Sequence, residues 1–158
     1  MTDTSPDNSE ASSEFRILPG PGHIRHYPAY NLFAWRPEGV LDDALLDQIG
    51  EWLCTIERTS PPFERFVDLS RLTEVAVRTN HVFDFARKRS EQLVGAQPMK
   101  SAIYSEDWVG FGIARMYESL MEGTSIDVRA FRDRAKAAIW LEVPEQVLKL
   151  EDRPVPSQ

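Results

Sequence analysis

Phe66-Val67-Asp68-Leu69-Ser70 is the stretch that decides the fold, because it is a short apolar segment that ends in polar residues. It is the second of a series of strand-then-helix units that extends over about residues 31–141. Such a series predicts a parallel or mostly parallel sheet covered by helices. In sheets of this kind, ligands and partners bind at the carboxyl ends of the strands. Asp68 and Ser70 therefore mark the place where a functional site is expected.

Length and composition indicate one domain of an ordinary cytoplasmic protein. The 158 residues, 42% of them hydrophobic, suffice for one domain with a core, whereas two domains would both be too small. The net charge of −7 argues against nucleic acid as a partner, because phosphate contacts need clustered Lys and Arg. Cys54 is the single cysteine, which excludes an internal disulfide and fits a reducing compartment. No apolar run approaches the roughly 20 residues of a membrane helix, and the acidic, Ser-rich start does not read as a secretory signal.

The apolar patterns predict a mostly parallel mixed sheet of four or five strands with about four helices. The domain is expected over residues 15–145, between a disordered tail at 1–14 and a C-terminal tail at 146–158. Apolar or alternating segments predict strands at residues 23–27, 31–36, 65–69, 100–104 and 126–131, of which the first two form an antiparallel pair. Apolar residues at helical spacing predict helices at residues 42–58, 80–93, 107–121 and 133–141. Residues 15–18 form either a short edge strand or a packing segment.

This order of elements resembles the STAS group, named after sulfate transporters and anti-sigma-factor antagonists, and more closely the SpoIIAA-like family of stand-alone bacterial proteins. The stretches that carry the resemblance are Phe66-Val67-Asp68-Leu69-Ser70, Lys100-Ser101-Ala102-Ile103-Tyr104, Ala114-Arg115-Met116-Tyr117, Val128-Arg129-Ala130-Phe131 and Ala138-Ile139-Trp140-Leu141. The resemblance implies an α/β fold with a curved sheet, no cofactor, and a regulatory role that depends on binding and not on catalysis.

Some proteins of the STAS group have a phosphorylation switch, but this chain lacks the motif on which that switch depends. In phosphorylated STAS antagonists, a strand ending in Asp-Leu-Ser leads to a helix that begins with an Asp-Ser-Ser-Gly motif. A serine of that motif accepts phosphate, and the added charge blocks the partner. This chain has Asp68-Leu69-Ser70, but its helix begins with Val77-Arg78-Thr79-Asn80. Thr79 is the remaining candidate phosphoacceptor.

Two groups of residues are candidates for binding a protein partner or a small anionic or polar ligand. The first is Asp68, Ser70, Arg78, Thr79 and Asn80, where a helix start and a cation could hold an anion. The alternative interpretation of this group is structural: Asp68 accepts hydrogen bonds from loop amides, and Thr79 or Asn80 caps the helix.

The second group follows the next strand and comprises Tyr104, Ser105 and Trp108, which could frame a small ligand. Its alternative is a helix cap by Ser105 or Asp107, with Trp108 buried against the sheet. Gly110 and Gly112 lack the third glycine of a dinucleotide loop and indicate close packing instead.

Other polar residues suggest no chemistry of their own. His23, His26 and His81 lack the spacing and companion ligands of a metal site. Arg87-Lys88-Arg89 is expected on the solvated outer face of its helix. No nucleophile motif is visible, so no catalytic residue is assigned.

Three hypotheses for the function follow. The leading one is a non-enzymatic STAS-like binding module that acts at the strand ends. The second is a small enzyme with Asp68 or Asp107 as acid/base, which would need a shifted carboxylate pKa in a deep cleft. The third is a self-associating structural protein, a homodimer joined through the edge strands of residues 15–33 or through a helix face.

Overall fold

The computed structural model describes residues 14–151. Residues 1–13 and 152–158, which make up most of the two predicted tails, lie outside the described part of the chain.

A six-stranded mixed sheet forms the centre of the fold, with strands in the order β1-β2-β3-β5-β7-β8. Its strands are β1 (Arg16–Leu18), β2 (His23–Tyr27), β3 (Leu32–Arg36), β5 (Glu64–Asp68), β7 (Met99–Tyr104) and β8 (Ile126–Phe131). The first three are antiparallel, and β3, β5, β7 and β8 are parallel. The predicted α/β class and mostly parallel mixed sheet are confirmed, but the predicted number of four or five strands is wrong. The sixth strand is β1, because its three residues pair in register with Ile24–His26 of β2.

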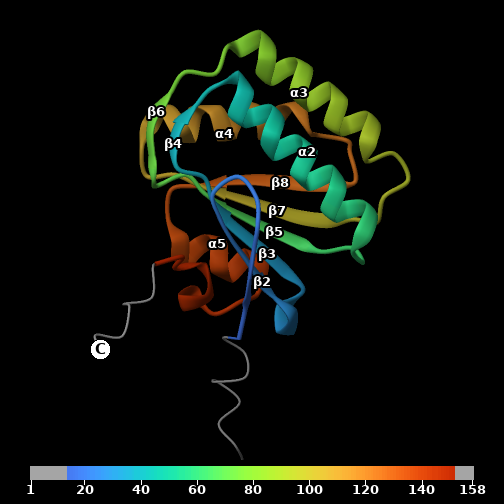
Figure 1. The fold of residues 1–158 in the computed structure, drawn as a ribbon, viewed down its shortest axis with the longest axis vertical. Coiled ribbons are helices and arrows are strands. Elements are labelled where there is room, and N and C mark those ends of the chain that lie inside the picture. The colour runs from blue at the N-terminus through green and yellow to red at the C-terminus, as the bar shows by residue number, and fades with distance from the viewer. Residues whose placement is uncertain (1–13, 152–158) are drawn as a thin grey trace, which may run out of the picture.

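Helices cover both faces of this sheet (Figure 1). They are α2 (Asp43–Thr59), α3 (Thr79–Gln92), α4 (Trp108–Leu120) and α5 (Arg134–Leu141). Figure 1 shows α2, α3 and α4 on one face and α5 on the other. Two short 3-10 helices complete the elements, η1 (Pro28–Tyr30) and η2 (Glu145–Leu148).

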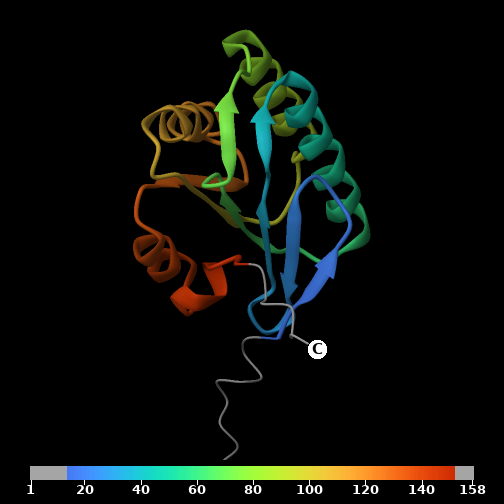
Figure 2. The same ribbon diagram turned by 60° about the vertical axis from the view of Figure 1, so that its left-hand side comes forward.

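A second sheet of two strands was not predicted from the sequence. Strand β4 (Gly39–Leu41) pairs with β6 (Leu72–Val75) in parallel. Figure 2 shows the two strands side by side and directed the same way. Strand β6 occupies the stretch between Ser70 and Arg78, so that a strand separates the two halves of the first candidate group.

Alternation along the strands divides the core between the two faces. Phe66 and Ala102 pack with α5, whereas Val67 and Ile103 face the layer of α2, α3 and α4. The α5 side of the core also contains side chains from beyond residue 145, namely Val147, Leu148 and Leu150. Residues 146–150, which the sequence pattern assigns to a tail, are therefore part of the folded domain.

Candidate functional site

Three adjacent parallel strands end in register at one edge of the sheet. Asp68 is paired with Tyr104, and Tyr104 with Phe131. Backbone hydrogen bonds also join the residues that follow these strands. The Leu69 amide donates to the Tyr104 carbonyl at 2.9 Å, and the Ser105 amide donates to the Phe131 carbonyl at 3.0 Å. The residues after β5, β7 and β8 therefore meet at this edge.

Asp68 is buried and its carboxylate is used within the fold. It accepts a hydrogen bond from the Ser70 amide at 2.8 Å and lies 3.6 Å from Nη2 of Arg134 at the start of α5. Ser70 itself is exposed. The expectation that Asp68 accepts from a loop amide is confirmed, and the same side chain also joins β5 to α5.

Tyr104 lies beside Asp68, on the face of the sheet that α5 covers. The Arg134 guanidinium lies 4.8 Å from the centroid of its ring. The Tyr104 hydroxyl donates to Oε1 of Glu106 at 2.6 Å. Burial, and then the hydrogen bond to Glu106, raises the pKa of Tyr104 to about 12.

Ser105 and Asp107 build the start of α4. The Ser105 side chain is buried and its hydroxyl donates to the Asp107 carbonyl at 3.1 Å. The exposed Asp107 carboxylate accepts from the amides of Val109 and Gly110, both at 3.1 Å, so the predicted cap by Asp107 is confirmed. A Cβ atom on Gly110 would lie 2.5 Å from the Ser105 hydroxyl oxygen, which confirms the predicted close packing at this glycine; the same prediction for Gly112 is wrong, because a Cβ atom there would meet open space.

Trp108 is 68% exposed, so its predicted burial against the sheet is wrong. Gly110 and Ala114 form the buried side of α4. Because each helical residue turns by about 100°, Trp108 points about 200° away from Gly110 and thus towards solvent. The Arg132 guanidinium lies 3.6 Å from the centroid of the Trp108 ring.

Further groups surround Trp108 and Arg132. Nη2 of Arg132 donates to the Glu106 carbonyl at 2.8 Å, and the Phe111 ring meets Trp108 edge-on at 6.2 Å. Val109 is 58% exposed. We call Trp108, Val109, Phe111 and Arg132 the Trp108 surface.

The other candidates lie at the start of α3. Asp43 of α2 accepts from the Arg78 amide at 2.9 Å and from its Nε at 2.5 Å, and these hydrogen bonds lower the pKa of Asp43. Thr79 and Asn80 are exposed, and the expectation that one of them caps the helix is wrong. The N-cap residue is Arg78, which provides no side-chain cap.

The structure thus divides the predicted site residues into two groups. Asp68 and Tyr104 share the Arg134 side chain, and Ser105 connects Tyr104 to the start of α4. Within residues 14–151, no hydrogen bond, ion pair or ring contact joins these residues to Arg78, Thr79 or Asn80. Alternation along the strands explains this, because Asp68 and Tyr104 face α5 whereas α3 covers the opposite face.

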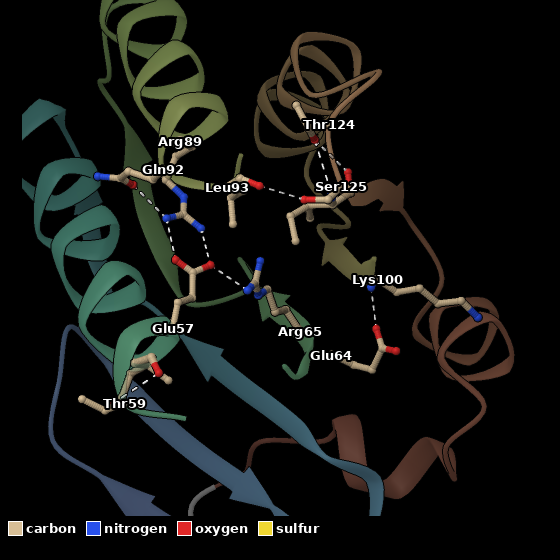
Figure 3. A network of polar contacts seen from close by, with 12 residues as sticks. Glu57, Thr59, Glu64, Arg65, Arg89, Gln92, Leu93, Lys100, Thr124 and Ser125 are labelled. Carbon is tan, nitrogen blue, oxygen red and sulfur yellow. Dashed lines mark hydrogen bonds and ion pairs between the residues drawn. The ribbon is translucent and has the colours of Figure 1, made fainter. Parts of the chain in front are cut away.

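A buried charged cluster was missed from the sequence. Arg89 was expected on the outer face of α3, but it is 2% exposed and pairs with Glu57 of α2. Arg65 of β5 pairs with the same glutamate (Figure 3). The signal was present, since Arg89 continues the buried helical spacing of Val82 and Ala86.

Residues 14–151 contain no group of three His, Cys, Asp or Glu side chains arranged to hold a metal ion. None of the described helices is both long enough and apolar enough to span a bilayer.

Comparison with known proteins supports the fold. No protein-family model and no curated protein sequence matches the chain. Among solved structures it is similar to an uncharacterised protein with a SpoIIAA-like fold from Shewanella loihica PV-4, with 16% identity and a TM-score of 0.50 over 81% of this chain and 95% of that chain. It also matches SiaC of Pseudomonas aeruginosa with 14% identity and a TM-score of 0.39 over 75% of this chain and 99% of that chain. The similarity to the Shewanella protein shows that the chain has a SpoIIAA-like fold, as the resemblance predicted.

Proposed function

We propose that this protein is a non-enzymatic binding module that engages a protein partner through the Trp108 surface, at the carboxyl ends of β7 and β8. The observation that carries the proposal is the exposed Trp108 ring, 68% accessible, with Arg132 held 3.6 Å from its centroid. Trp and Arg are the residue types most enriched among those that contribute most to protein binding. Because Arg132 and Phe111 already orient the ring, Trp108 loses less rotamer freedom when a partner covers it.

The exposure of Trp108 favours a protein partner over a small ligand. Small-molecule sites enclose most of the ligand surface in a cleft. Trp108 and its neighbour Val109 instead present apolar area outward, with exposed fractions of 68% and 58%. Exposed apolar area of this kind is typical of protein interfaces.

The roles of the two carboxylates support binding over catalysis. A general acid or base must reach the proton that it transfers. Asp68 is buried and pairs with the Ser70 amide and Arg134. Asp107 caps α4 through two backbone amides. Both carboxylates proposed as acid/base in the enzyme hypothesis therefore have structural roles.

The proposal is tested by affinity capture followed by binding measurements on purified proteins. The full chain serves as bait in a bacterial lysate, the captured protein is identified by mass spectrometry, and its affinity is measured by calorimetry. We expect Trp108→Ala to weaken binding about 30-fold, the effect of a loss of about 2 kcal/mol at a central interface residue. Ile139→Ala is the matched control, because Ile139 of α5 is 76% exposed and lies outside the Trp108 surface.

Variants at the start of α3 distinguish the two candidate groups. Arg78→Ala and Thr79→Ala should leave the affinity unchanged. If they weaken binding while Trp108→Ala does not, the partner binds at the start of α3 and the proposal is wrong. Circular dichroism of each variant confirms that the domain is folded.

A further inference from the structure

Two arginines share one carboxylate between the sheet and its helical layer. Glu57, near the end of α2, accepts two hydrogen bonds from Arg89 of α3, at 2.8 Å and 2.7 Å. The same carboxylate accepts from Nη2 of Arg65 of β5 at 2.7 Å. Figure 3 shows the three side chains pointing toward one another from their separate elements. Arg65 is 4% exposed and Arg89 is 2% exposed.

This cluster holds an excess of positive charge. Among the described residues, Glu57 is the one carboxylate that pairs with either arginine. Both guanidinium groups stay protonated, because the pKa of arginine lies so far above neutrality. Buried charges are normally matched by opposite charges. Burial lowers the pKa of Arg65, and the neighbouring Arg89 lowers it further, against the attraction of Glu57.

Each arginine also retains an unused hydrogen-bond donor. The Nε atoms of Arg65 and Arg89 are buried and have no hydrogen-bond partner. Buried donors of a guanidinium are seldom left without an acceptor. Excess positive charge and unpaired donors together indicate that the cluster can accept an anion.

The same two side chains line a cavity of about 100 Å³ between the sheet and helices α2, α3 and α4. Ser101 lies beside Arg65 in register on β7, and Tyr117 of α4 interacts electrostatically with Arg89. These four residues form the polar part of the lining. The rest of the lining is apolar and includes Leu53, Val67, Val82, Ile103 and Ala114.

We propose that this cavity binds a small aliphatic carboxylate, with the carboxylate at Arg65 and Arg89 and the hydrocarbon chain against the apolar lining. The apolar lining disfavours inorganic phosphate, which has no hydrocarbon to bury. An engineered protein cavity of about 150 Å³ holds benzene. A cavity of about 100 Å³ therefore fits a ligand of the size of butyrate.

A larger hollow lies next to the charged end of the cavity. This hollow of about 460 Å³ is lined by Glu57, Phe63, Val94 and Met99, and Arg65 lines both spaces. Arg65 and Met99 lie near the amino ends of their strands. The charged end of the cavity therefore lies at the edge of the sheet opposite to the Trp108 surface, and this proposal does not depend on the proposed function.

Ligand binding to the wild-type protein provides the main test. Sodium butyrate, n-butanol and sodium phosphate are compared at constant ionic strength by calorimetry and thermal unfolding. We expect butyrate to bind one to one with a dissociation constant of about 1 mM or lower and to raise Tm. n-Butanol, which lacks the charge, should bind at least about tenfold more weakly, because the charged hydrogen bonds are lost. The proposal is overturned if butyrate neither binds nor raises Tm, if n-butanol binds equally well, or if phosphate is preferred.

Variants that fill the cavity test the location. Ala114 is buried and lines the cavity, so Ala114→Leu should abolish butyrate binding without touching the charged residues. Ala44→Leu is the matched control on the exposed side of α2 and should bind as the wild type does. Because overpacking can destabilise a core, the smaller Ala114→Val provides a second variant. Unchanged butyrate affinity in a folded Ala114 variant would place the ligand elsewhere and contradict the proposal.

Discussion

Arg89 of α3 and Glu57 of α2 are joined by two parallel hydrogen bonds, from Nη1 to Oε1 at 2.8 Å and from Nη2 to Oε2 at 2.7 Å. Paired bonds of this kind fix the guanidinium in the plane of the carboxylate. Arg65 of β5 donates to the same Oε2 atom. Glu57 of α2 therefore connects its own helix with α3 and with β5 of the sheet.

Glu57→Gln should be strongly destabilising. The substitution keeps the shape of the side chain but leaves two buried guanidinium groups without a carboxylate. Breaking a buried ion pair by removing one partner costs about 3–5 kcal/mol. Urea unfolding followed by circular dichroism measures the loss of free energy.

The control for this variant is Glu51→Gln, which changes an exposed residue of the same helix. It should alter the free energy of unfolding by no more than about 0.5 kcal/mol. A cost for Glu57→Gln as small as that of the control would show that the ion pair contributes little to stability.

The order of the main elements could be predicted because apolar periodicity is a local property of the sequence. The predicted strand at residues 126–131 coincides with β8, and the predicted helix at 42–58 differs from α2 by one residue at each end. Strand β6 was missed because its pairing partner β4 lies about 30 residues earlier in the chain. Burial of Leu148 and Leu150 likewise depends on packing against α5 and the sheet, which no local pattern encodes.

The candidate site was predictable only in part, for the same reason. The cap by Asp107 is local and was expected. The exposure of Trp108 was not, because it depends on which side of α4 packs against β7 and β8. Arg89 lay in the buried spacing of α3, but its charge hid the signal, since a buried arginine needs a partner such as Glu57 that only the fold brings near.

Alanine at the two glycines of α4 should have opposite effects. A Cβ atom on Gly112 meets open space, so Gly112→Ala should stabilise the protein by about 0.5–1 kcal/mol through the helix propensity of alanine. A Cβ atom on Gly110 would lie 2.5 Å from the buried Ser105 hydroxyl oxygen, so Gly110→Ala should cost about 1–3 kcal/mol by overpacking. Thermal unfolding compares the two variants, and equal Tm values would contradict the close packing at Gly110.

Asp107→Ala should remove the N-terminal cap of α4. Two backbone amides lose their acceptor, and loss of a cap of this type costs about 1 kcal/mol. Asp107→Asn should restore most of the stability, because asparagine caps a helix about as well as aspartate. Asp84→Ala, an exposed change within α3 that removes a surface ion pair, should alter the free energy of unfolding by less than about 0.5 kcal/mol. An effect of Asp107→Ala as small as that of Asp84→Ala in urea unfolding would show that the cap is dispensable.

Tyr104 should make stability fall at alkaline pH. Burial and then Glu106 raise its pKa from 10.0 to about 12, so the folded state favours the neutral hydroxyl. This contribution is complete below pH 10, where the hydroxyl is neutral in both states, and is lost as the pH rises towards 12. Ultraviolet absorbance of tyrosinate measures the titration, and the difference between wild type and Tyr104→Phe isolates this residue among the four tyrosines. Glu106→Gln should move the titration of Tyr104 to lower pH, because the substitution removes the negative charge that opposes ionisation of the Tyr104 hydroxyl. If the alkaline loss of stability is the same in Tyr104→Phe as in the wild type, another group causes it.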